Sequence, residues 1–213
     1  MIHAYDESYL SDAMNGLGSM LDFAVNSCGE SLALFYARFL RSGVADQMEK
    51  GNPRYLCGLS GVELAQAVAA RTGRPLGPAD AFIDMGSPEF WTGWTLAYLQ
   101  WALGVSFKAL AKADVGPEAL LARYAPLHEA DLSKAWAFAQ KALAKHRQAE
   151  NPLRTQRMNA GLTQASLAVL SGLSLRSIRA YEQSQLSLSN AGAESMLRLA
   201  RVLGCEVEEL VGR

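Results

Sequence analysis

Cysteine is scarce in this sequence, and the few cysteines stand far apart. Cys28, Cys57 and Cys205 form no Cys-x-x-Cys pair and no cluster with histidine in a chain of 213 residues. Zinc sites need several such ligands at short spacing and disulfide frameworks need paired cysteines, so neither is expected. An odd set of free cysteines is typical of a reducing compartment, and we expect a cytoplasmic protein.

Long apolar runs are also missing. The longest, from Trp94 to Val105, is interrupted by Thr95 and Gln100, and it is shorter than the roughly 20 residues that a bilayer span requires. The first ten residues carry Asp6 and Glu7 and lack the basic and then apolar stretches of a secretory signal. We therefore expect neither a membrane span nor a signal peptide.

Strand patterns, in which apolar and polar residues alternate among β-branched side chains, are absent as well. Apolar residues recur at three- and four-residue steps, which predicts a helix from about Glu7 to Gly29 and a second one ending near Gly43. Gly51-Asn52-Pro53 breaks the pattern. Ser60-Gly61-Val62-Glu63 is a capping box that begins a helix running to about Arg71. The sequence predicts an all-α fold.

The next predicted helix carries most of the aromatic side chains. After a loop rich in Gly and Pro from Thr72 to Ser87, Ser87 and Pro88 are a typical helix start. The spacing of the aromatics places four of them on one face, for which core packing is favoured over a ligand platform: Phe90, Trp94, Tyr98 and Trp101. Trp91 lies off this face and is our candidate contact for a protein partner.

Two further helices are predicted before the sequence changes character. Gly116-Pro117-Glu118 begins a short one, and a longer one runs from His128 to about Ala149. Its inward residues are Leu132, Ala135, Trp136, Ala139 and Leu143. Asn151-Pro152 then marks a linker or helix break. We therefore expect a helical domain over residues 1–150 and a second domain over residues 151–213.

The second domain contains two short predicted helices joined by a tight turn. Thr163 caps the first helix, Gly172 lies in the turn where a left-handed backbone is needed, and Ser174 caps the second helix. The positions expected to pack the helices together are Leu167, Ala168, Leu173, Ile178 and Tyr181. Two helices with such a turn describe a helix-turn-helix.

The outward face of the second helix is the predicted DNA-reading surface, because it enters the major groove in such units. Arg176 and Arg179 have the donor fork that suits O6 and N7 of guanine, and Leu175 either meets a thymine methyl or is an ordinary exposed leucine. Thr163 and Gln164 would donate to phosphate oxygens. The predicted DNA-binding residues are Thr163, Gln164, Ser174, Leu175, Arg176, Ser177, Arg179 and Gln183.

Residues Leu153 to Val211 resemble the Cro/C1-type (Xre-like) helix-turn-helix family. The matching residues are Gly161-Leu162-Thr163-Gln164, Ser171-Gly172-Leu173-Ser174, Ile178-Arg179-Ala180-Tyr181-Glu182-Gln183, the Leu197 to Gly204 helix, and Val207-Glu208-Glu209-Leu210. The resemblance implies a five-helix, lambda-repressor-like domain of a DNA-binding regulator. The loop from Ser184 to Ala193 departs from the family because it is longer and lacks the usual Gly. A homodimer is expected on a palindromic operator, since one recognition helix reads few base pairs.

The N-terminal part resembles a poorly characterised bacterial helical family. The segments are Tyr9 to Met14, Leu21 to Asn26, and Ser87 to Trp91 with Gly93-Trp94. That family is found fused to this kind of helix-turn-helix and encoded beside ADP-ribosyltransferase-like toxin genes. The resemblance implies an antitoxin whose residues 1 to about 150 bind and neutralise the toxin, with operon autoregulation by the helix-turn-helix.

No catalytic constellation is readable. Gly16-Leu17-Gly18 lacks the third Gly and the preceding strand of a dinucleotide loop. His128-Glu129 with Asp131 lacks zinc-helix spacing and suits a helix N-terminus, and Asp80 with Asp84 suits a solvated loop. We expect no enzyme, no metal and no cofactor. Two alternatives stay open: a helical enzyme that uses the loop at residues 72–87, and a protein-interaction module with solvated arginines on its second helix.

The net charge is also small, at −1 for the whole chain. This value averages two unequal parts, because residues 1–150 hold 13 basic and 16 acidic residues, whereas residues 151–213 hold 7 and 5. All seven basic residues of the second part are arginine, which favours forked donors over diffuse cationic attraction. A near-zero total therefore does not exclude DNA, and it predicts weak nonspecific binding.

Overall fold

The computed structural model describes residues 3–77, 80, 82–149 and 151–211, and every regular element within them is helical. The predicted all-α fold is confirmed. The chain separates into two compact units, residues 1–143 (unit 1) and residues 144–213 (unit 2). Across the described ranges, no helix has both the length and the apolar character needed to traverse a membrane.

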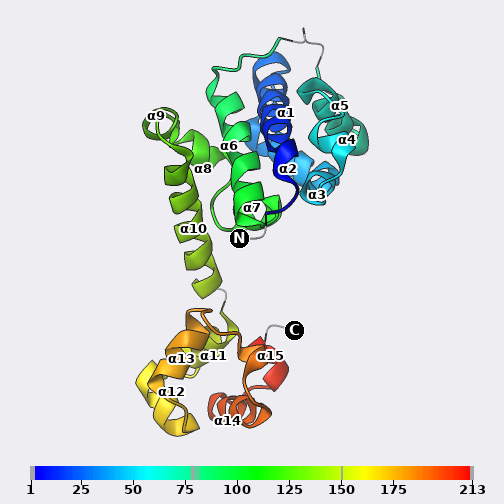
Figure 1. Ribbon diagram of the computed structural model, residues 1–213. Helices are drawn as coiled ribbons and strands as arrows, with labels where there is room; N and C mark the ends of the chain where they lie inside the picture. The colour runs from blue at the N-terminus through cyan, green and yellow to red at the C-terminus, as the bar shows by residue number, and fades with distance from the viewer. Residues whose placement is uncertain (1–2, 78–79, 81, 150, 212–213) are drawn as a thin grey trace. The chain divides into compact units, whose positions relative to one another are not determined.

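Unit 1 (Figure 1) contains a bundle of helices joined by short connections, except for the longer connection between α5 and α6. Its elements are η1 (Glu7–Tyr9), α1 (Leu10–Asp22), the π-helical turn η2 (Phe23–Ser27), α2 (Leu32–Arg41), α3 (Val44–Glu49), α4 (Pro53–Leu56), α5 (Gly61–Arg71), α6 (Pro88–Leu103), α7 (Phe107–Lys112), α8 (Pro117–Leu121), α9 (Tyr124–Leu127) and the first part of α10 (Leu132–Ala149).

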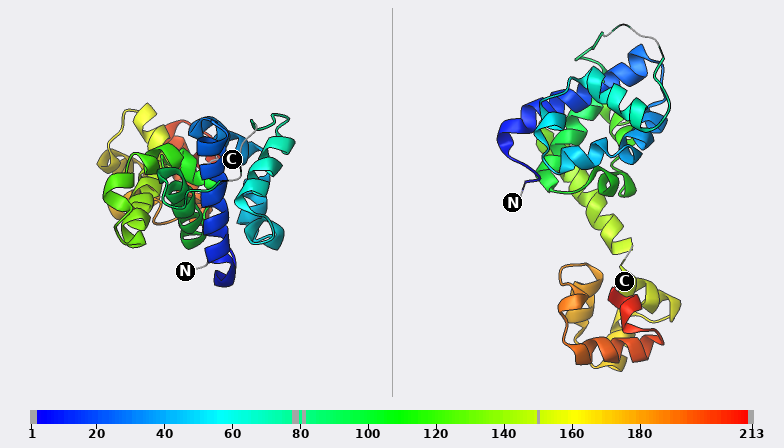
Figure 2. Two further views of the ribbon diagram at one scale, coloured as in Figure 1. Left: turned by 90° about the horizontal axis from the view of Figure 1, so that it is seen from above. Right: turned by 90° about the vertical axis from the view of Figure 1, so that its right-hand side faces the viewer.

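The centre of unit 1 is the close crossing of α1 and α6, which lie side by side in Figures 1 and 2. Two glycines make this approach possible. A Cβ on Gly93 would lie 2.4 Å from the carbonyl oxygen of Leu17, and a Cβ on Gly18 would lie 2.9 Å from the carbonyl oxygen of Phe90. Both distances are shorter than real Cβ contacts, so only glycine permits this spacing of the two helices.

The aromatic face predicted for α6 is only partly in the core. Phe90 and Trp101 are buried, whereas Trp94 and Tyr98 are half-buried against the same core. The α6 residues with no exposed surface are Thr92, Thr95, Leu96, Ala97 and Leu99. Because α6 is covered on several sides, its small and aliphatic residues occupy the closest contacts, and the rings of Trp94 and Tyr98 lie toward the edges.

A buried carboxylate fastens the loop before α6 to the end of α1. Asp22 Oδ1 accepts hydrogen bonds from Ser87 Oγ at 2.6 Å and Asn26 Nδ2 at 2.7 Å, and its Oδ2 accepts one from Asp84 N at 2.9 Å. The side chain is 1 % exposed. These hydrogen bonds satisfy a group that would otherwise be costly to bury.

The predicted helix from His128 begins four residues later than expected. His128 instead follows α9, and its ring Nδ1 lies 3.0 Å from the carbonyl oxygen of Tyr124. Asp131 Oδ1 accepts from Ser133 N at 2.8 Å and so satisfies a first-turn donor of α10. The predicted inward residues are confirmed, since Ala135, Ala139 and Leu143 are buried and Leu132 and Trp136 are half-buried against the core.

Unit 2 contains the remaining helices. Its elements are α11 (Pro152–Asn159), α12 (Gln164–Ser171), α13 (Leu175–Glu182), η3 (Leu188–Asn190), α14 (Ala193–Leu203) and α15 (Val207–Val211). They surround a separate core made of Leu153, Leu167, Ala168, Ile178, Leu188, Leu199, Ala200, Leu203 and Leu210. The domain boundary expected at residue 150 falls on a residue outside the described ranges, and α10 runs across the point where the two units divide.

Candidate nucleic-acid interface

The two helices α12 and α13 are joined by the turn that the sequence predicts. Gly172 takes φ +68, the left-handed conformation in which glycine has no steric cost. Thr163 Oγ1 accepts from Ser166 N, and Ser174 Oγ accepts from Ser177 N, each at 3.0 Å. The caps therefore begin both helices as expected, and the turn between them is fixed by local chemistry.

The inner faces of α12 and α13 pack as predicted. Leu167, Ala168 and Ile178 are buried, while Leu173 and Tyr181 are half-buried against the same core. Leu175 was expected to face outward, but its side chain also packs partly against this core. The first turn of α13 lies close to the body of unit 2, so Leu175 is divided between core packing and solvent.

The outer face of α13 presents three long polar side chains. Arg176, Arg179 and Gln183 are exposed, and among the described residues their side chains make no intramolecular hydrogen bond or ion pair. Ser177 differs, because it is half-buried and its hydroxyl lies 2.8 Å from Ser174 Oγ. The arginine donors are therefore uncommitted, whereas the two serine hydroxyls are engaged in capping.

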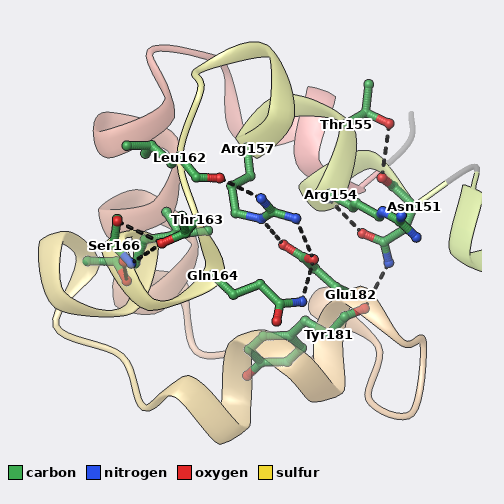
Figure 3. A network of polar contacts seen from close by, with 12 residues as sticks. Asn151, Arg154, Thr155, Arg157, Leu162, Thr163, Gln164, Ser166, Tyr181 and Glu182 are labelled. Atoms are coloured by element: carbon green, nitrogen blue, oxygen red, sulfur yellow. Dashed lines mark hydrogen bonds and ion pairs between the residues drawn. The ribbon is translucent and has the colours of Figure 1, made fainter.

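Behind this face lies a buried ion pair that the sequence analysis missed (Figure 3). Arg157 of α11 donates to Glu182 from Nε at 2.6 Å and from Nη2 at 3.0 Å, and Gln164 Nε2 donates to the same carboxylate at 2.8 Å. Arg157 also donates from Nη1 to the carbonyl oxygen of Leu162. Glu182 ends α13 and is 3 % exposed. One carboxylate thus connects α11, α12 and α13.

The electrostatics of the pair follow from this geometry. Hydrogen bonds to Glu182 raise the pKa of Arg157 above its ordinary value, against the lowering effect of burial. Arg157 and Glu182 are 25 residues apart, so no local spacing rule could have paired them. The nearest sequence signal was an arginine in the helix before the helix-turn-helix and an acid at the end of its second helix.

The same network limits what Gln164 can offer to DNA. Gln164 was predicted to donate to phosphate, yet its side chain is half-buried and one amide hydrogen is directed to Glu182. Only the second amide hydrogen and the helix backbone remain available there. Thr163 likewise uses its oxygen as a cap. Phosphate contacts at the start of α12 would therefore come mainly from backbone amides.

The loop after α13 explains how the chain manages without the expected glycine. Ser184 takes φ +55, a left-handed conformation unusual for a residue with a side chain. Asn151 Nδ2 donates to the carbonyl oxygen of Tyr181 at 2.8 Å and lies 3.5 Å from Ser184 Oγ. Leu188 is buried further along the loop. The loop that departs from the family pattern is therefore anchored by the hydrogen bond from Asn151 to Tyr181 and by the burial of Leu188.

The remaining candidate residues from the sequence belong to unit 1. In unit 1, Trp91 is half-buried against the core, with Tyr124 edge-on at a centroid distance of 5.5 Å. Asp80 is exposed, while Asp84 Oδ1 accepts from Gly86 N. Within the described part of the chain, no group of three or more potential metal ligands comes together.

Fold and surface together define a helix-turn-helix DNA-binding domain, and the chain is a DNA-binding transcriptional regulator. Residues 153–210 match the helix-turn-helix family model, in agreement with the predicted Cro/C1-type resemblance of that segment. Neither curated proteins nor solved structures yield a match to this chain. The toxin-antitoxin resemblance of the N-terminal part stays a prediction.

Proposed function

We propose that this protein is a transcriptional repressor that reads a palindromic operator as a homodimer. The observation that carries the proposal is the two-sided character of α13. Ile178 and Glu182 fix one side in the core, while Arg176, Arg179 and Gln183 are exposed with free donors on the other. Uncommitted guanidinium forks on a fixed helix match the edge of guanine in the major groove.

Charge supports DNA as the target of this face. Residues 153–201 carry six arginines and two glutamates. One of these glutamates, Glu182, is neutralised by Arg157, and the other, Glu194, pairs with Arg198. The two glutamates therefore compete little for Arg176 and Arg179, which remain available to the negatively charged DNA.

The symmetry of the operator follows from the small size of the reading surface. A single recognition helix contacts few base pairs, whereas two copies about 34 Å apart read two half-sites on one face of the duplex. We therefore expect a two-fold operator with half-sites about one helical turn apart, and two chains on each operator.

The test begins with selection of operators from a random duplex library by the full chain, followed by fluorescence anisotropy. Arg176→Ala should cost about 1 to 3 kcal/mol of specific binding and relax the preference at one base position. Arg41→Ala, an exposed arginine of unit 1, is the matched control and should bind as the wild type does. If Arg176→Ala bound the operator with unchanged affinity and unchanged base preference, the assignment of this face as the DNA-reading surface would be wrong.

A second candidate function is neutralisation of a partner protein by unit 1, and we propose it on a specific observation. Leu34, Phe82 and Met85 are 57 %, 71 % and 67 % exposed. Phe82 and Met85 are three residues apart on the segment before α6, and exposed apolar side chains are typical of partner surfaces when they are contiguous. The partner that the N-terminal resemblance implies is a toxin of the ADP-ribosyltransferase-like class, with Trp91 as a contact.

Co-expression with the product of the adjacent gene tests this second function. A stable complex whose yield falls with Phe82→Ser and Trp91→Ala, and whose formation suppresses the toxicity of the partner, would support it. If the regulator were recovered without a partner, this second function would be contradicted and the first proposal, a repressor, would remain.

A further inference from the structure

A hollow of about 640 Å³ opens on unit 1 at the end of α5, and we call it the α5 hollow. Its lining comes from η2, from the last turns of α5 and from the segment that follows α5, residues 73–77. The volume lies in the range of about 300 to 1,000 Å³ that is usual for small-molecule sites. The hollow lies in a different unit from the DNA-reading helix, and no proposed function above uses it.

The wall of the α5 hollow is more apolar than polar. It includes Phe23, Ala69, Ala70 and Leu76, of which Phe23 and Ala69 belong to the packed core. Phe23 begins the π-helical turn η2, where Cys28 N donates to the carbonyl oxygen of Phe23 at 3.0 Å. Such turns are rare within helices and are frequent at functional sites. The apolar side chains of this wall can contact the apolar body of a ligand.

Among the described residues that line the hollow, the charged one is Arg74, whose side chain is 62 % exposed. The carboxylate nearest to it belongs to Glu30, at 3.8 Å, and this carboxylate also pairs with buried Arg38 at 3.1 Å. Two guanidinium groups thus share one carboxylate, which leaves one positive charge in excess. The long contact to Glu30 leaves Arg74 able to form bidentate hydrogen bonds with an incoming anion.

The backbone at Arg74 is held by a buried arginine. Arg38 is 4 % exposed, and it donates from Nε to Thr72 Oγ1 at 3.1 Å and from Nη2 to the carbonyl oxygen of Arg74. These hydrogen bonds hold the backbone that follows α5. A rim that is ordered before binding lowers the entropic cost of placing the ligand.

We propose that the α5 hollow binds a small organic carboxylate with an apolar body. The carboxylate pairs with Arg74 at the rim, with the amide of Gln66 as a second donor from the lining. The apolar body occupies the space against Phe23 and the two alanines of α5. This makes unit 1 a ligand-binding unit in its own right.

The test is isothermal titration of the full chain with 1-naphthoate and with its uncharged counterpart, 1-naphthamide. We expect saturable 1:1 binding of naphthoate, and binding of the amide at least about tenfold weaker because the charged hydrogen bond is missing. Arg74→Gln should weaken the binding of naphthoate by a similar factor and leave the binding of naphthamide unchanged. Ala70→Phe should abolish binding of both by filling the hollow.

Arg41→Gln is the matched control, because it removes an exposed arginine of unit 1 that does not line the hollow. Tryptophan fluorescence confirms folding of each variant, since all four tryptophans belong to unit 1. The inference is overturned if naphthoate shows no saturable binding in the millimolar range. It is also overturned by equal binding of acid and amide to the wild type, or by undiminished binding to the folded Ala70→Phe variant.

Discussion

Ser184 has a backbone conformation that a side chain makes costly, and it lies two residues after the end of α13. At φ +55 its Cβ is crowded by the neighbouring carbonyl oxygen, which costs about 1 to 2 kcal/mol in an ordinary residue. The contact with Asn151 at 3.5 Å is long for a hydrogen bond and offsets little of this cost. The conformation itself is required, because it returns the chain toward buried Leu188.

Ser184→Gly should therefore stabilise unit 2 by about 0.5 to 1 kcal/mol, because glycine adopts a left-handed conformation without this crowding. Hydrogen exchange of the α13 amides in the full chain measures the change. Ser187→Gly is the control, since Ser187 has φ −74 and should gain nothing. Equal shifts in both variants would show that the left-handed conformation carries no strain.

At the scale of elements, the crossing of α1 and α6 decides how tightly unit 1 packs. Gly93→Ala would place a methyl group 2.4 Å from the carbonyl oxygen of Leu17. The helices would have to separate, and we expect unit 1 to lose about 1 to 3 kcal/mol of stability to overpacking. Urea unfolding followed by tryptophan fluorescence measures the loss.

Gly16→Ala provides the comparison on α1. Its methyl group would meet only the flexible end of Leu64, at 3.4 Å. Alanine is favoured over glycine inside a helix, so this variant should be neutral or more stable by up to about 1 kcal/mol. If both alanines destabilised unit 1 to the same extent, helix spacing would not be the cause.

The contact between α3 and α7 contains a titratable group with a predictable effect. Glu49 Oε1 accepts from Phe107 N at 2.7 Å. Burial raises the pKa of Glu49, with that backbone hydrogen bond opposing the shift. The folded state therefore holds the proton more tightly than the unfolded state does. The contribution of Glu49 to the free energy of unfolding should fall as pH rises through its folded pKa.

Glu49→Gln keeps an acceptor for Phe107 and removes the titration. The stability of the variant relative to wild type should increase between about pH 4 and pH 8, as urea unfolding would report. Glu118→Gln, an exposed glutamate of the same unit, serves as the control. A constant difference between Glu49→Gln and wild type across this range would contradict the assignment.

At the scale of the whole molecule, the chain has two units, each with its own core and its own features. Unit 1 holds all four tryptophans and the α5 hollow, and unit 2 holds the helix-turn-helix and an excess of arginine. The near-zero total charge is the sum of an acidic part and a basic part. Averaged properties of the chain therefore describe neither unit.

Separate cores predict separate unfolding. Arg157→Met leaves Glu182 buried without its cation, which should cost unit 2 about 3 to 5 kcal/mol. Hydrogen exchange in α12 and α13 should quicken accordingly, while the urea transition seen by tryptophan fluorescence should not move. Arg154→Met on the same helix is the control, because the Arg154 side chain is not part of the Glu182 network. A shifted tryptophan transition in Arg157→Met would mean that the two units unfold together.

Local sequence chemistry determined the helices and the helix-turn-helix itself. Caps such as Ser60, Ser87, Thr163 and Ser174 act within three residues, and the Gly172 turn depends on one backbone conformation. These interactions join near neighbours along the chain, so spacing alone revealed them. The exposure of Arg176 and Arg179 followed from the helical period in the same way.

Only the tertiary structure decided which distant residues meet. Glu182 finds Arg157 across 25 residues, Asp22 finds Ser87 across 65, and Leu175 turns partly toward the core of unit 2. The α5 hollow likewise exists only because η2 and the segment after α5 come together. Most buried polar groups find partners where the packed helices bring them, and the geometry of the core makes that choice rather than the local sequence.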